Sequence, residues 1–116
     1  MKKVANKDFI VYLYGFSTVL ASKLTNLVQI LENQLEKDAQ ISIVFIHDGV
    51  IGTIQKSRKS QALKKLLNLP LNFYTMIPDL KARGIDTKKI QTKIIGIEYS
   101  ELVDILAKTP KIVSWL

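Results

Sequence analysis

The polar residues best suited to chemistry follow apolar runs of the sequence, at the points where strands are predicted to end. His47 and Asp48 follow one such run, and Asp79 follows another. An imidazole and carboxylates are the usual groups of general acid–base catalysis. Because ligands of open parallel sheets bind beyond the carboxyl ends of the strands, these positions define one candidate pocket. The residues of this predicted pocket are Ser17, His47, Asp48, Gly49, Asp79 and Tyr99.

One hypothesis for this pocket is a small hydrolase or transferase built on His47. It requires the imidazole to lie within about 3 Å of the Ser17 or Thr18 hydroxyl, or of a shared water. No nucleophile-elbow pattern surrounds either hydroxyl, and Asp48 points to the opposite strand face from its neighbour. The sequence therefore favours a histidine that is hydrogen-bonded to a loop over a catalytic one.

Residues 49–53 follow a predicted strand and could present backbone N–H groups to an anion. The segment lacks the lysine and the spacing of a P-loop, and it lacks the three-glycine dinucleotide fingerprint. Asp48-Gly49 also fits an ordinary turn, because glycine tolerates positive φ. The chain has no cysteine and a single histidine, and its acidic residues fit no metal-ligand spacing, so we predict neither a cofactor nor a metal.

The elements that position these residues alternate between strand and helix. Nearly all-apolar runs predict buried strands, and apolar residues at spacings of three and four predict amphipathic helices between them. The expected fold is α/β, with one domain over residues 1–116 and a three-layer αβα arrangement around a mostly parallel five-stranded sheet. The predicted strands are 9–15, 41–46, 71–76, 92–97 and 111–116, and the predicted helices are 18–38, 57–67, 79–83 and 101–108, the last capped by Ser100.

Positive charge is concentrated in one part of the chain. The formal net charge is +7, and residues 54–93 hold ten lysines and arginines against two acids. A field of one sign attracts anionic partners such as RNA, nucleotides or acidic proteins, whereas lysines alone also keep a small protein soluble. The predicted basic partner surface consists of Lys56, Arg58, Lys59, Lys64, Lys65 and Arg83.

Aromatic residues divide between the core and the surface. Tyr12, Tyr14 and Phe16 alternate along the first strand and therefore share a face, where packing under helices is favoured over base stacking. Tyr99 and Trp115 are predicted subunit contacts, because aromatic residues with a polar tip are enriched at interfaces.

Three stretches of the chain resemble a known family. They are the strand leading into Asp48-Gly49-Val50, the strand and turn of residues 73–84 with Asp79-Leu80-Lys81-Ala82-Arg83-Gly84, and the helix start in residues 97–103 together with Trp115. In these residues the chain is similar to the DsrE/DsrF/DsrH-like sulfur-relay proteins, and within them to the DsrH/TusB branch.

The resemblance implies a three-layer subunit that assembles with related small subunits, often in a hexamer of three different chains. Such complexes pass persulfide sulfur between cysteines, toward 2-thiouridine in tRNA or in sulfur oxidation. A thiolate is needed to accept and donate sulfane sulfur, and this chain contains no cysteine. The expected role is therefore a non-catalytic subunit that docks cysteine-bearing partners, not an enzyme.

The expected partners are DsrE/DsrF-type subunits or further copies of this chain. An acidic sulfur carrier protein or tRNA would face the basic segment. No apolar run approaches the roughly 20 residues that span a bilayer, so we expect no membrane partner and a cytoplasmic location. The alternative is a stand-alone RNA- or nucleotide-binding module on the same fold, which depends on the basic segment and residues 49–53.

Overall fold

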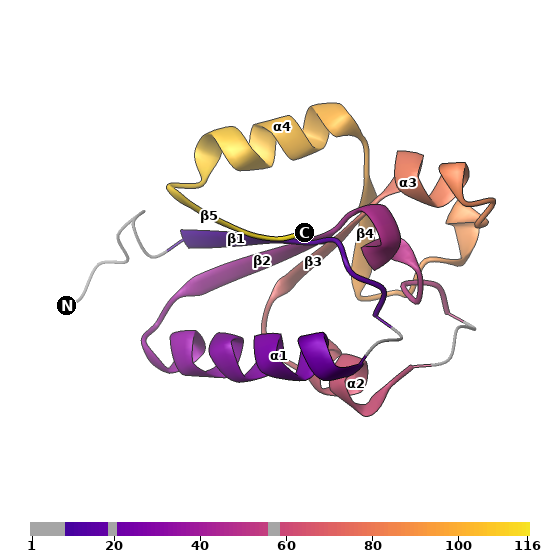
Figure 1. Ribbon diagram of the computed structural model, residues 1–116. Coiled ribbons are helices and arrows are strands. Elements are labelled where there is room, and N and C mark those ends of the chain that lie inside the picture. Colours follow the sequence, from indigo (N-terminus) through magenta and orange to yellow (C-terminus); the bar gives the residue numbers. More distant parts are fainter. Residues whose placement is uncertain (1–8, 19–20, 56–58) are drawn as a thin grey trace.

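The computed structural model describes residues 9–18, 21–55 and 59–116. They form three layers, with helices on both sides of a single sheet (Figure 1). The strands are β1 (Phe9–Tyr14), β2 (Gln40–Phe45), β3 (Asn72–Met76), β4 (Ile94–Ile97) and β5 (Lys111–Trp115). The helices are α1 (Ala21–Glu36), α2 (Gln61–Leu67), α3 (Ile77–Ala82) and α4 (Tyr99–Lys108), with short 3-10 helices η2 (His47–Val50) and η3 (Thr87–Lys89).

The five strands pair in the order β4-β3-β2-β1-β5, and every pair is parallel. In Figure 1, α1 and α2 cover one face of the sheet, and α3 and α4 lie on the other side. The predicted three-layer αβα fold is therefore confirmed. The strand order reverses at β1, which is where open α/β sheets commonly bind ligands.

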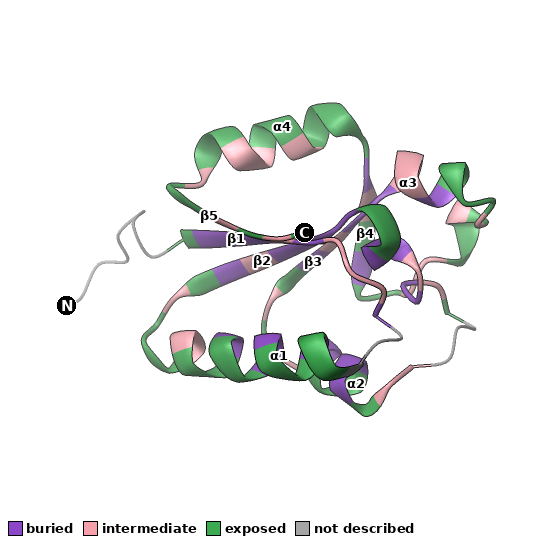
Figure 2. Cartoon of the chain, viewed as in Figure 1, coloured by how far each residue is buried: buried purple, intermediate pink, exposed green. Residues whose placement is uncertain are grey.

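The core is centred between the sheet and α1, where purple segments of strand and helix face each other in Figure 2. Tyr12 and Tyr14 are buried on this face, so the preference for core packing over base stacking is confirmed for both. On α1, Leu24, Leu27 and Leu31 are fully buried at the predicted spacing. Residues 19–20 of the predicted helix lie outside the described residues.

The starts of α2, α3 and α4 differ from the prediction, and α3 begins at Ile77 instead of Asp79. α2 begins at Gln61, where Ser60 accepts a hydrogen bond from the Leu63 N–H at 3.1 Å. α4 begins at Tyr99, so the predicted cap at Ser100 is wrong. Instead, the backbone N–H of Glu98 donates to the Glu101 carboxylate at 2.9 Å, which is one half of a capping box.

Tyr14 offers a test of the core, because within the described residues its hydroxyl is a buried polar atom without a hydrogen-bond partner. We expect Tyr14→Phe to raise the free energy of unfolding by about 1 kcal/mol, since it removes an unsatisfied group while keeping the ring. Tyr12→Phe is the matched control. The Tyr12 hydroxyl donates to the Gln34 side chain, so its removal should lower stability by about 1 kcal/mol. Urea titrations of the two variants measure both changes.

The same tyrosine predicts a difference at alkaline pH. Burial raises the pKa of Tyr14 to about 12, above its ordinary value of 10.0. An unfolded tyrosine therefore ionises first, and this favours unfolding as the pH rises from 10 toward 12. The stability gained by Tyr14→Phe should grow over that interval. A constant difference across it would contradict the burial of this hydroxyl.

Candidate functional site

The carboxyl end of β2 runs into η2, whose first residue has an unusual backbone. His47 has a φ of 52°, in the left-handed region that L side chains rarely adopt. Its backbone N–H donates to the carboxylate of Asp79, in the first turn of α3, at 2.7 Å. The prediction of a positive φ at Gly49 is wrong, because the residue of this turn with a left-handed backbone is His47.

Arg83 links the same two segments. Its guanidinium lies 3.1 Å from the Asp48 carboxylate in a salt bridge, and it also donates to the Asp79 backbone carbonyl at 3.2 Å. Both side chains of the pair are partly exposed, so the ion pair itself contributes only about 0–1 kcal/mol. Its role is geometric, because it holds α3 against the end of β2. These contacts support a scaffold role for the Asp79–Gly84 turn.

Gly49 is required for a close approach of two backbone segments. A Cβ at this position would lie 2.2 Å from the carbonyl oxygen of Tyr14, on the neighbouring strand β1. That oxygen also accepts the Ile46 N–H at 3.0 Å. The helix η2 therefore packs directly against the end of β1, and any side chain at Gly49 would separate them.

The loop of residues 49–53 does not present an anion cradle. Its Gly49, Ile51 and Thr53 N–H groups each donate to the backbone carbonyl three residues earlier in the chain, at 2.8, 3.0 and 3.2 Å. Donors that are already paired within the loop are not directed at a ligand. The nucleotide-binding interpretation of this loop therefore has no support in the geometry.

The two residues proposed as nucleophiles, Ser17 and Thr18, both interact with other parts of the protein. Thr18 is buried, and its hydroxyl donates to the Ile51 carbonyl. Ser17 is half-buried and makes an interaction of its own. His47 is exposed and enters the described hydrogen bonds only through its backbone. A hydrolase with His47 as base therefore gains no support.

The predicted strand-end pocket is assembled only in part. The structure brings His47, Asp48 and Asp79 together, but Tyr99 is 59 % exposed at the start of α4 and joins none of their described hydrogen bonds. At the point where the strand order reverses, Leu116 lies against Gly15, since a Cβ on that glycine would be 2.9 Å from the Leu116 side chain. The Leu116 side chain, although 61 % exposed, therefore occupies the space next to Gly15 at this end of the sheet.

The predicted basic surface is divided among different sites. Lys56 and Arg58 lie outside the described residues, and Arg83 is paired with Asp48. Lys64 lines a hollow beside β4, whereas Lys65, its neighbour on α2, lines a different hollow between α1 and α2. Lys93 belongs to the basic segment of residues 54–93 but was not included in the predicted surface, and it lines the first hollow together with Lys59 and Lys64.

The side of the sheet that carries α4 is covered only in part. Three apolar residues of α4 are half-buried against the core: Leu102, Ile105 and Leu106. No residue of α4 is buried, and Tyr99 and Val103, one helical turn apart, are 59 % and 61 % exposed. On the same side of the sheet, Ile95 on the edge strand β4 and Ile112 on the opposite edge strand β5 are 58 % and 46 % exposed. We call these four residues the α4 apolar surface. The sequence singled out only Tyr99, because apolar residues in strands and helices were taken as core.

Trp115, the other predicted subunit contact, is half-buried at the end of β5. Its ring centroid lies 6.3 Å from that of Tyr14, on the α1 side of the sheet. The side chain is therefore held by the protein's own core.

Within the described ranges, no three His, Asp or Glu side chains are grouped so that they could hold a metal ion. In the same ranges, no helix has the length and apolar character needed to cross a membrane.

These features define a small three-layer α/β domain whose strand ends are closed by an ion-paired turn. The fold is shared with solved structures. The crystal structure of the ychN protein from E. coli matches with a TM-score of 0.72 and 15 % identity, over 91 % of this chain and 97 % of that one. A protein of unknown function, MTH1491 from Methanobacterium thermoautotrophicum, matches with a TM-score of 0.71 and 17 % identity, over 92 % and 98 %.

Sequence comparison gives the family. The model of the "DsrH like protein" family matches residues 19–112. Protein TusB of Escherichia coli strain K12 is 32 % identical over 73 residues, which are 63 % of this chain and 73 % of that protein. Protein TusB of Erwinia tasmaniensis is 27 % identical over the same length. The chain therefore belongs to the DsrH-like family, and the predicted DsrH/TusB resemblance is confirmed.

Proposed function

We propose that this protein is a non-catalytic subunit of a cytoplasmic sulfur-relay complex that acts by docking cysteine-bearing partners. The observation that carries the proposal is the combination of DsrH-like family membership with a chain of 116 residues that contains no cysteine. The family resemblance implies persulfide relay toward tRNA thiolation or sulfur oxidation. Because this chain has no thiol, the sulfur must travel on another subunit.

The chemistry of sulfur relay explains why partners are required. Sulfane sulfur moves when a thiolate attacks a persulfide and takes its outer sulfur. Hydroxyl, imidazole and carboxylate groups do not replace the thiolate in that exchange. A DsrH-like chain without cysteine can therefore contribute shape, charge and contact surface, while cysteines of the related subunits carry the sulfur.

The α4 apolar surface is the face we assign to the related subunit. Its four side chains, Ile95, Tyr99, Val103 and Ile112, lie on one side of the sheet and are each about half exposed or more. Isolated apolar residues on a surface are ordinary, but α4 has no fully buried residue and leaves apolar side chains exposed at both edges of this sheet face, so further burial is available. Tyr99 supplies the aromatic anchor with a polar tip that interfaces favour.

The test is gentle affinity capture of the tagged full-length chain from its native host, followed by a persulfide-selective label. We expect small cysteine-bearing relatives to co-elute and to take the label. The tagged Val103→Glu variant serves as the control bait, because it should fold but lose those partners. If wild type and Val103→Glu both elute alone and unlabelled, the relay proposal is wrong.

A further inference from the structure

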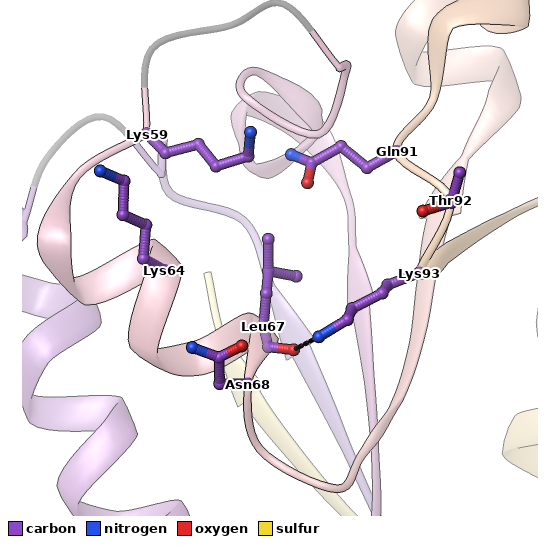
Figure 3. Close-up of a pocket in the computed structure, with 7 residues that line it drawn as sticks. All are labelled: Lys59, Lys64, Leu67, Asn68, Gln91, Thr92 and Lys93. Atoms are coloured by element: carbon purple, nitrogen blue, oxygen red, sulfur yellow. Dashed lines mark hydrogen bonds between the residues drawn. The ribbon is translucent and has the colours of Figure 1, made fainter.

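A hollow with a cavity volume of about 350 Å³ lies between α2 and the segment that leads into β4 (Figure 3). Three lysines line it: Lys59 before α2, Lys64 on α2, and Lys93 before β4. We call it the lysine pocket. Its volume falls at the lower end of the roughly 300–1,000 Å³ of small-molecule sites. The lysines come from two chain segments that the fold brings together, so the charge is concentrated by tertiary structure.

The lysines of this pocket differ in how they are engaged. Lys93 donates to the Leu67 carbonyl at 3.0 Å, which neutralises the partial negative charge at the end of α2. Among the described residues, no carboxylate forms a salt bridge with Lys59 or Lys64. Lys59 extends toward Gln91 across the hollow in Figure 3. Two ammonium groups are therefore left to meet a charge from outside the chain.

The other lining groups suit oxygen atoms of a ligand. The side chains of Asn68, Gln91 and Thr92 can donate from amides or a hydroxyl, and Leu67 supplies an apolar contact. The described lining contains no carboxylate, which would repel an anion, and no aromatic ring on which a base could stack. Such a lining recognises the charge of an anion and not the identity of a base.

We propose that the lysine pocket binds the phosphate groups of a phosphate-bearing ligand. Lysine ammonium groups bind phosphate oxygens as point charges. The pocket has no arginine among its lining residues, so an anion there would be held by point charges and hydrogen bonds and not by a bidentate fork. The two sources of such phosphates are a compact phosphate compound and the backbone of an RNA strand, and the experiment separates them.

The comparison with the other hollows favours this one for an anion. The hollow between α1 and α2 contains Glu32 beside Lys65, and a third hollow, at the amino ends of β2 and β3, contains Asp38. Each of those carboxylates would oppose an anionic ligand. The proposal goes beyond the docking role and does not depend on it, since the α4 apolar surface lies on the other side of the sheet.

The test measures binding of inorganic pyrophosphate and of a twelve-nucleotide oligouridine to the full chain at several salt concentrations. Wild type should bind at least one of them, and Lys64→Glu should weaken that binding about fivefold or more at low salt. For the oligonucleotide, loss of one phosphate contact should reduce the slope of log affinity against log salt by about 0.7. Amide NMR signals of Asn68 and Gln91 should shift on titration with either probe.

The matched control is Lys65→Glu. It makes the same change of charge at the next residue of α2, which is also exposed, but its side chain lines the other hollow. It should retain nearly all of the wild-type affinity. Lys64→Gln removes the cation without adding repulsion, and circular dichroism melts verify that each variant folds.

Each outcome decides the proposal. Binding of pyrophosphate identifies a compact phosphate ligand, and binding of oligouridine alone identifies an RNA strand. The proposal is overturned if neither probe binds at low salt, or if Lys65→Glu weakens binding as much as Lys64→Glu does. It is also overturned if a twelve-residue polyglutamate binds as tightly as the phosphate probes, because the site would then belong to an acidic protein.

Discussion

Gly49→Ala is expected to lower the free energy of unfolding by about 3 kcal/mol or more, at the upper end of the usual cost of overpacking. The new Cβ would lie 2.2 Å from the Tyr14 carbonyl oxygen and 3.2 Å from its carbonyl carbon. These are backbone atoms of β1, which is hydrogen-bonded to β2 on one side and β5 on the other. The strand cannot move away without loosening both ladders, so η2 itself must be displaced.

Alanine substitutions at two further glycines provide comparisons for the effect of Gly49→Ala. At Gly84, which has a φ of 68°, a Cβ would meet nothing within 4 Å, so Gly84→Ala tests backbone conformation alone and should cost about 1–2 kcal/mol. At Gly96 a Cβ would lie 2.9 Å from the Ile90 side chain and 3.0 Å from that of Ile77. Those side chains can adjust, so Gly96→Ala should cost less than Gly49→Ala.

Urea denaturation of the three alanine variants measures this series. If Gly49→Ala were no more destabilising than Gly84→Ala, the direct packing of η2 on the end of β1 would be incorrect. The Arg83–Asp48 pair would then have to hold the turn, and that pair is too exposed to contribute more than about 1 kcal/mol.

The fold could be predicted because strands and helices leave patterns among residues that are close together in the sequence. Strands buried on both faces have nearly continuous apolar sequences, as β1 does, and α1 repeats leucines at helical spacing. The cap of α4 was mistaken because Ser100 is a good cap by type, whereas Glu98 and Glu101 form a reciprocal pair that decides the start. A choice between neighbouring caps depends on where the preceding strand ends.

The candidate sites were less predictable because they depend on distant parts of the chain. The segment of residues 54–93 was correctly identified as basic, but the charge count does not separate Lys64 from Lys65. Neighbours on a helix point about 100° apart, and here that angle directs them into different hollows. From the sequence, Gly49 was explained by the ability of glycine to adopt a positive φ. In the structure a glycine is needed there because the Tyr14 backbone, on another strand, leaves no room for a Cβ atom.

The two proposed binding faces lie on opposite sides of one rigid sheet. The lysine pocket is formed on the α2 side, beside β4, and the α4 apolar surface is on the other side. A related subunit on α4 would therefore leave the pocket open, so loss of one function need not remove the other. This separation makes single surface substitutions informative about each face.

Val103→Glu is expected to weaken association with the partner subunits at least about tenfold, the effect of placing a charge within the apolar centre of an interface. Val103 is 61 % exposed, so the free chain should lose no more than about 0.5 kcal/mol of stability. Ile30→Glu is the matched control, because Ile30 is 39 % exposed on α1, across the sheet from α4. Sedimentation velocity of the co-purified complex compares both variants with wild type. Since Ile30→Glu adds the same charge to the opposite layer, it should leave the complex intact. Dissociation by Ile30→Glu in place of Val103→Glu would assign the partner to the α1 side instead.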